Sequence, residues 1–253
     1  MKNLPDTKFS PSLNIDQKEI WAIIPARGGS KRLPRKNVMP FAGQGSLTAR
    51  TVKTALSSQK FSQVLVSTDD SEIAEEARRA GARLPFLRPA HLADDQASSL
   101  EVIKHAVQQL LQLAPTRPPF AICLLQVTSP FLKPEQVSAA VDKFLAGGFN
   151  SLSSMVAVEQ FPEWMFRSDP VSGIAVPDQP EGITRSSGAI PQRFIENGAL
   201  YLVSAEWLDR QGSLYDFSRH GMYLMSREDS VDIDTQADWD YAEMLVRRQI
   251  SAC

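Results

Sequence analysis

The sequence predicts an α/β fold in which helices sandwich a mostly parallel sheet. Short apolar runs at 20–24, 63–68 and 120–126 predict buried strands. Stretches with apolar residues at helical spacing alternate with these runs, and such alternation indicates βαβ units with right-handed crossovers. A length of 253 residues with 43% hydrophobic content suits one large domain.

The predicted elements follow in order along the chain. We expect strands at 20–24, 63–68, 120–126, 151–158 and 198–203, and helices at 47–57, 71–80, 98–113, 134–147 and 236–250. Asp69 and Asp70 are interpreted as a strand end and a helix cap, and Ser98 or Ser99 as another cap. Pro134 suits the first turn of its helix. Because ligands bind beyond the carboxyl ends of strands in such sheets, the loops after Ile24, Thr68 and Gln126 are the expected site.

Two regions stand outside this alternation. Residues 1–19 are polar and without a period, so we expect a flexible leader before a main domain at 20–250. Residues from about 155 to 195 are irregular and contain Pro, Gly, Trp and Phe. Exposed apolar excursions often mediate association, so this segment predicts a small dimerisation excursion and a homodimer.

Composition excludes several classes of protein. The net charge of −2 gives no basic field for nucleic acid. The only cysteines, Cys123 and Cys253, form no CxxC pair, which argues against a zinc site or a disulfide framework. No apolar stretch reaches membrane-spanning length and no signal-like segment opens the chain, so we expect a cytoplasmic protein that makes no membrane contact.

A basic loop follows the first predicted strand. Residues 25–37 read PARGGSKRLPRKN and carry five cations within ten residues: Arg27, Lys31, Arg32, Arg35 and Lys36. Gly28 and Gly29 let the backbone approach a ligand closely. Cations and backbone donors at a strand end suit a triphosphate, although a solvated basic loop is the alternative. Neither GxxxxGK[ST] nor GxGxxG occurs, which argues against a P-loop NTPase and a dinucleotide fold.

An acidic pair lies near the C-terminus, in the segment VDIDT at 231–235. In an extended segment Val231 and Ile233 face the core while Asp232 and Asp234 face outward together. Such a pair suits Mg²⁺, which prefers few carboxylates, several waters and phosphate oxygens. The alternative is that Asp234 only caps the final helix.

Four segments resemble the acylneuraminate cytidylyltransferase family, the CMP-sialic and CMP-nonulosonic acid synthetases. They are PARGGSKRLPRKN, FLRPAHLADDQASS at 86–99, LLQVTSPF at 124–131 and VDIDT. The resemblance extends over roughly 20–246 and implies a Rossmann-like sheet of the nucleotidyltransferase type. It also implies a catalytic set of Arg27, Lys31, Lys36 and Asp234, and metal ligands Asp232 and Asp234.

The resemblance further assigns the substrates to residues. The nucleotide is expected on Arg27, Gly28, Ser30, Lys31, Lys36, Asn37, Arg88, Ala97 and Ser99. The sugar is expected on Gln126, Asn197, Tyr201 and Arg185, the last of which reaches across the dimer interface, with Arg193 as the fallback. Asn197 and Tyr201 belong to the segment FIENGALY at 194–201, which resembles the sialic and legionaminic branch. A satisfied loop amide is the alternative for Gln126.

The predicted reaction is the transfer of CMP from CTP to the anomeric 2-hydroxyl of a nonulosonic acid, with Mg²⁺ as cofactor and release of pyrophosphate. Positioning and charge neutralisation carry most of the acceleration in such transfers. The alternatives are a related sugar nucleotidyltransferase that acts on pseudaminic acid, Kdo or a sugar 1-phosphate, and a non-catalytic nucleotide-binding protein on the same fold.

Overall fold

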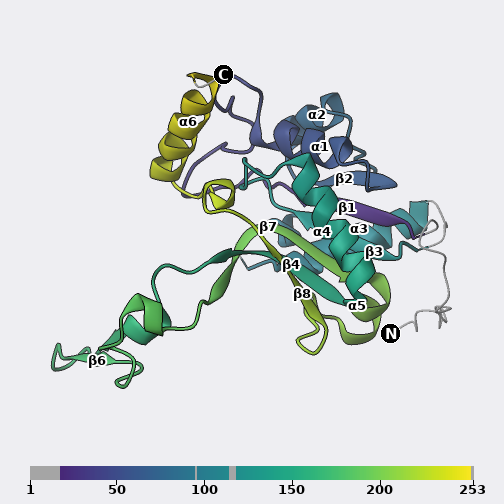
Figure 1. Cartoon of the computed structure of the whole chain (residues 1–253). Coiled ribbons are helices and arrows are strands. Elements are labelled where there is room, and N and C mark those ends of the chain that lie inside the picture. Colours follow the sequence, from purple (N-terminus) through teal and green to yellow (C-terminus); the bar gives the residue numbers. More distant parts are fainter. Residues whose placement is uncertain (1–17, 95, 114–117, 252–253) are drawn as a thin grey trace.

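The computed structural model describes residues 18–94, 96–113 and 118–251, so most of the predicted leader lies outside the described residues. Figure 1 shows a central sheet with helices on both faces. The main strands are β1 (Ile20–Pro25), β2 (Gln63–Ser67), β3 (Ala121–Leu125), β4 (Ser151–Ala157), β7 (Phe194–Ser204) and β8 (His220–Leu224). The helices are α1 (Leu47–Ser57), α2 (Ser71–Arg79), α3 (Ser99–Leu113), α4 (Pro134–Gly147), α5 (Ala205–Gln211) and α6 (Gln236–Ser251).

The sheet has the strand order β2-β1-β3-β7-β4-β8. The pairs β1–β2, β1–β3 and β4–β8 are parallel, whereas β7 runs antiparallel to both of its neighbours. The expected mostly parallel sheet is therefore confirmed, with one strand of opposite direction. The chain leaves the sheet at the end of β4 and re-enters it at the same edge as β7, so β7 runs opposite to β4.

Side chains of β1 divide the core into two layers, as alternation in a buried strand requires. Ala22 and Ile24 belong to a core that includes apolar residues of α1, α2 and α4. Trp21 and Ile23 belong to a second core with apolar residues of α3 and α5. The predicted sandwich of helices around the sheet is confirmed.

Local sequence signals account for most helix starts. Asp70 caps α2 by accepting hydrogen bonds from Glu72 N and Ile73 N. Ser98 rather than Ser99 caps α3, because its hydroxyl accepts from Glu101 N at 3.2 Å while the Glu101 carboxylate accepts from Ser98 N. The short helix α5 escaped prediction because seven residues contain too few turns for a clear apolar period.

Residues 158–193 form an arm that extends away from the sheet between β4 and β7 (Figure 1). The arm contains a separate two-stranded sheet of β5 (Phe166–Ser168) and β6 (Ala175–Pro177). Met165, Ile174 and Val176 are exposed apolar residues on it. Among the described helices, none has both the length and the apolarity needed to cross a bilayer.

Helix α6 places the acidic segment beside the basic loop. Trp239 is 6% exposed and packs edge-on against the fully buried Phe41, with ring centroids 5.2 Å apart. The Glu243 carboxylate accepts a hydrogen bond from Ala42 N at 3.0 Å. These contacts fix the start of α6, and with it the preceding residues 231–235, next to the loop that follows β1.

Candidate active site

The predicted site residues gather mainly at one edge of the sheet. β1, β2 and β3 are parallel, so the loops that follow them share an edge. β7 begins at that edge because it runs the opposite way, and the segment after β8 returns to it because β8 is parallel to β4. The segments 25–37, 126–131, 194–201 and 231–235 therefore lie along this edge.

Lys36 joins the basic loop to the acidic segment. Its side chain is buried, and Nζ donates to the Ile233 carbonyl at 2.6 Å and to Asp234 Oδ1 at 3.0 Å. The Arg32 guanidinium lies 2.7 Å from Asp234 Oδ2. Two cations of the loop thus hold one carboxylate, and the convergence expected between the two distant motifs is present.

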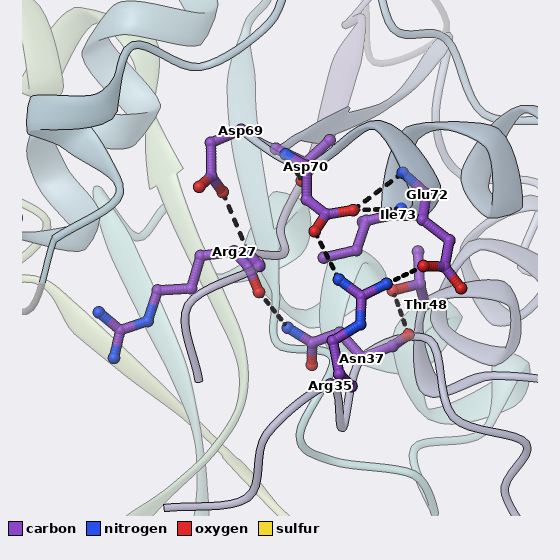
Figure 2. A network of polar contacts seen from close by, with 10 residues as sticks. Arg27, Arg35, Asn37, Thr48, Asp69, Asp70, Glu72 and Ile73 are labelled. Carbon is purple, nitrogen blue, oxygen red and sulfur yellow. Dashed lines mark hydrogen bonds and ion pairs between the residues drawn. The ribbon is translucent and has the colours of Figure 1, made fainter. Parts of the chain in front are cut away.

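Two acids after β2 hold the basic loop, one through its backbone and one through a side chain (Figure 2). Asp69 accepts a hydrogen bond from Gly28 N at 3.1 Å. Asp70, the cap of α2, also accepts from Arg35 Nη1 at 2.7 Å. Arg35 adopts a left-handed backbone with φ of 63°, which turns the loop at this point. These acids have the structural role that their position predicts.

Gly28 leaves no room for a side chain. A Cβ at this position would lie 2.6 Å from Asp70 Oδ2, and Asp70 cannot move easily because the helix cap and Arg35 hold it. We expect Gly28→Ala to lower the free energy of unfolding by about 1–3 kcal/mol through overpacking, measured by urea denaturation. Gly29→Ala is the matched control: a Cβ there meets nothing within 4 Å, so a change of about 0.5 kcal/mol or less is expected. Equal losses in both variants would contradict this account.

The other loop residues take different positions. Asn37 is buried and donates from Nδ2 to the Arg27 carbonyl at 2.9 Å, while its Oδ1 has no hydrogen-bond partner among the described residues. That oxygen can accept a hydrogen bond from a ligand. The Arg27 side chain extends away from the Asp69–Asp70 network (Figure 2). Lys31 is exposed on the loop, and Ser30 N bonds the Gly28 carbonyl at 3.1 Å.

The acidic segment has the expected alternation. Ile233 is fully buried and Val231 packs against the same core, whereas Asp232 faces solvent. Ile233 N donates to the Thr128 carbonyl at 2.8 Å, which ties the segment to the loop after β3. Desolvation by the surrounding chain raises the pKa of the Asp232 carboxyl, although the residue remains accessible; the hydrogen bond from Thr128 opposes the rise and the charge of Asp234 adds to it.

The donor set of this segment fits magnesium. Asp232 and Asp234 supply hard carboxylate oxygens close enough to interact electrostatically. In the described part of the chain, no group of three or more His, Cys, Asp and Glu side chains forms a metal-binding cluster. A cation held here therefore needs oxygen ligands from water and substrate as well, which is the coordination that Mg²⁺ prefers.

A pocket of about 520 Å³ opens beside Asp232. Its polar lining consists of Glu196, Asn197, Tyr201, Ser230 and Asp232. It therefore brings two predicted sugar contacts together with one predicted metal ligand. A pocket of this size, with a few converging polar groups, suits a small polar ligand.

Asn197 and Tyr201 differ in what they offer a ligand. Asn197 is 8% exposed; its Oδ1 accepts from Ser154 Oγ at 2.6 Å and its Nδ2 donates to Ser230 Oγ at 2.9 Å. The Asn197 amide thus shapes the pocket wall, and its direct contact with sugar stays a prediction. Burial raises the pKa of Tyr201 to about 12, helped by the charges of Glu196 and Asp232, so its hydroxyl remains a donor at neutral pH.

The predicted nucleotide contacts after β2 are engaged within the chain. Arg88 is 6% exposed, and its guanidinium donates to Ser67 Oγ at 3.1 Å and to the Ser67 carbonyl. Burial lowers the pKa of Arg88 to about 10, while the charge of Asp69 opposes this shift. Ala97 N donates to Asp94 Oδ1 at 2.8 Å. Ser99 is the first residue of α3, next to the Ser98 cap.

Gln126 and the arginines of the arm occupy different places. Gln126 follows β3 directly, and its side-chain amide makes no hydrogen bond within the described residues, so it is available to a ligand. Arg185 is exposed on the arm, which extends away from the sheet (Figure 1). Arg193, the fallback, pairs with Glu163 at 2.5 Å. Neither arginine is among the residues that line the pocket.

Three contacts of the site were not predicted. Arg32 lies in the basic loop but had no assigned partner, and it contacts Asp234. Thr128 lies two residues beyond Gln126 and bonds the acidic segment. Glu196 precedes Asn197 and lines the same pocket. The only sequence signal for Glu196 is its position next to Asn197. Strict strand alternation would place the Glu196 side chain on the face of the sheet opposite to Asn197.

Comparisons with known proteins agree with this geometry. Residues 21–252 match the protein family described as cytidylyltransferase. The CMP-N,N'-diacetyllegionaminic acid synthase of Legionella pneumophila is 34% identical over 90% of this chain and 96% of the relative. The pseudaminic acid cytidylyltransferase of Campylobacter jejuni serotype O:2 is 33% identical over 89% of this chain and 95% of the relative.

A solved structure supports the fold. The CMP:2-keto-3-deoxy-manno-octonic acid synthetase complexed with CTP superposes with a TM-score of 0.64 at 15% identity, covering 92% of this chain and 100% of that chain. The family match extends over almost the whole chain and includes every segment that forms the site. The chain belongs to the cytidylyltransferase family.

Proposed function

We propose that this enzyme transfers CMP from CTP to the anomeric 2-hydroxyl of a nonulosonic acid of the sialic or legionaminic type and releases pyrophosphate. The observation that carries the proposal is the contact of Lys36 and Arg32 with Asp234 beside the pocket that Asp232 lines. Two cations, two carboxylates and a polar pocket at one sheet edge support a site for a nucleoside triphosphate, a metal ion and a small sugar. Relatives that are named for nonulosonic acids support the choice of sugar.

The basic loop is proposed to hold the triphosphate. Arg27 and Lys31 belong to a loop that Asp69 and Asp70 hold in place. Lys36, which is anchored on the Ile233 carbonyl, is proposed to stabilise negative charge on the leaving pyrophosphate. A preorganised cation costs little reorganisation during the reaction, so these residues act by position rather than by proton transfer.

The chemical step is proposed to be an in-line attack of the sugar 2-hydroxyl on the α-phosphorus, in which the bond to the pyrophosphate oxygen breaks. Asp232 and Asp234 are proposed to hold Mg²⁺, which when bound supplies charge neutralisation on the phosphate oxygens. Gln126 is proposed to contact the sugar with its open amide. Tyr201 lines the pocket and offers the sugar a hydroxyl donor and a flat apolar face.

The assembly and the compartment are also proposals. The arm exposes Met165, Ile174 and Val176, which supports a homodimer in which Arg185 of one copy serves the other copy's sugar site. Cys123 is buried as a free thiol, which is compatible with a cytoplasmic location.

A pyrophosphate-release assay tests the function. The purified protein is incubated with Mg²⁺ and CTP, ATP, GTP or UTP, against sialic, legionaminic and pseudaminic acids, Kdo and a sugar 1-phosphate. We expect release only with CTP, and fastest with sialic or legionaminic acid. Preference for Kdo, for a sugar 1-phosphate or for another nucleotide would replace the proposed substrates. CTP binding without turnover of any sugar would indicate a non-catalytic protein.

A further inference from the structure

We infer that Glu196, held by Tyr215, is a specificity-determining acceptor that recognises N–H and O–H groups of the acidic sugar away from its reacting carbon. The inference rests on the proposed function, because it assigns a role in binding that sugar. Glu196 lines the pocket together with Tyr201 and Asp232. No role had been assigned to it from the sequence.

The geometry fixes one carboxylate oxygen of Glu196 and leaves the other available. Tyr215 Oη donates to Glu196 Oε2 at 3.0 Å. Burial, together with this hydrogen bond, raises the pKa of Tyr215, so the phenol stays protonated and remains the donor. Glu196 Oε1 has no hydrogen-bond partner among the described residues, so it can accept from a ligand.

Tyr215 is itself held firmly. Its carbonyl accepts hydrogen bonds from Trp207 Nε1 at 3.2 Å and from Ser213 Oγ at 3.0 Å. Its ring stacks on Phe217 with centroids 5.6 Å apart and an interplanar angle of 8°. A rigid donor of this kind preorganises the carboxylate that it contacts.

The backbone of β7 explains why Glu196 faces the pocket beside Asn197. Strand register between β4 and β7 shifts between Ser153 and Met155, and Gly198 adopts a φ of 78°. An irregularity of this kind interrupts the alternation of faces and redirects a side chain. A Cβ on Gly198 would meet nothing within 4 Å, so glycine is needed there for its conformation rather than for space.

Charge determines which part of the sugar Glu196 can meet. The described residues that line the pocket include the acids Glu196 and Asp232 and no lysine, arginine or histidine. A carboxylate repels the sugar's own carboxylate, which is attached to the reacting anomeric carbon, and attracts hydroxyl and acylamino donors. Asp232 differs from Glu196 because the proposed Mg²⁺ would offset its charge, so the reacting end can lie near Asp232 and Glu196 is left to bind donors on the rest of the sugar.

Steady-state kinetics of Glu196→Gln test this role, with sialic acid and its analogue that carries a hydroxyl in place of the acylamino group. We expect the KM for sialic acid to rise roughly 10- to 100-fold, as for loss of a charge-assisted hydrogen bond, with the KM for CTP unchanged. Glu206→Gln on α5, an exposed glutamate paired with Arg210, is the control and should leave both constants unchanged. A change in the ratio of kcat/KM between the two sugars identifies the acylamino N–H as the donor, and equal losses identify hydroxyl groups.

A second variant separates positioning from general structural damage. Tyr215→Phe keeps the stacked ring but removes the donor, so the sugar KM should rise about 3- to 10-fold. The same change should have little further effect in the Glu196→Gln background, because the two residues act as one unit. Tyr223→Phe on β8, a strand that β4 separates from β7, is the control. An unchanged sugar KM in Glu196→Gln would overturn the inference, and so would a parallel rise in the KM for CTP. Turnover by the wild-type protein tests the proposed function separately, so neither outcome would contradict that function.

Discussion

Asp234→Asn is expected to lower kcat by roughly 10²–10³-fold at saturating CTP and Mg²⁺, while the protein stays folded. Asparagine preserves the shape of the side chain but removes the charge on which Lys36 and Arg32 converge. It also removes one of the two proposed metal carboxylates, so half-maximal activity should require more Mg²⁺. Pyrophosphate release as a function of Mg²⁺ concentration measures both effects.

Asp240→Asn is the matched control for this substitution. Asp240 lies on the exposed side of α6 and bonds only Gln236 within the described chain. Its replacement should leave kcat and the Mg²⁺ requirement unchanged. Retention of most wild-type activity by Asp234→Asn under the same conditions would show that Asp234 is not a metal ligand.

Lys36→Met is expected to reduce both activity and stability. The substitution removes the buried ammonium that donates to the Ile233 carbonyl and to Asp234. Loss of these bonds should lower the free energy of unfolding by about 1–3 kcal/mol, and loss of a preorganised cation should lower kcat by roughly 10²-fold or more. Urea denaturation and pyrophosphate release provide the two measurements.

Arg32→Met gives the comparison that separates the two effects. Arg32 contacts the same carboxylate, but its side chain is 67% exposed, so its ion pair contributes little to stability. We expect a stability change below about 1 kcal/mol and a smaller loss of kcat than in Lys36→Met. Equal losses of stability and of kcat in the two variants would show that burial does not distinguish the role of Lys36 from that of Arg32.

Sequence patterns were sufficient for the main fold because local periods and caps agreed with the tertiary structure. The strand at 20–24 and the helix at 47–57 occur where their apolar patterns predict them. The direction of β7 could not be predicted, since its composition is that of any buried strand. It depends on the arm that returns the chain to the same edge.

In the candidate site, too, some features follow from the sequence and others do not. The alternation in 231–235 predicts which faces Asp232 and Ile233 present, because it depends only on extended backbone geometry. Two features could not be predicted from the sequence. The pairing of Arg32 with Asp234 depends on how the basic loop folds. The orientation of Glu196 toward the pocket depends on the irregular register between β4 and β7. Interactions of this kind arise from tertiary structure rather than from local preference.

The anchoring of the acidic segment by α6 has a consequence for biosynthesis. Lys36 and Asp234 are 198 positions apart, and the Phe41–Trp239 contact that secures them spans a similar length of chain. A nascent chain that has emerged only as far as β8 contains the cationic loop and every strand of the main sheet, but neither aspartate. Because a chain emerges N-terminal end first, the acidic segment can meet the cationic loop only after every strand of the main sheet has been synthesised. Chains that end at or before β8 should therefore be enzymatically silent.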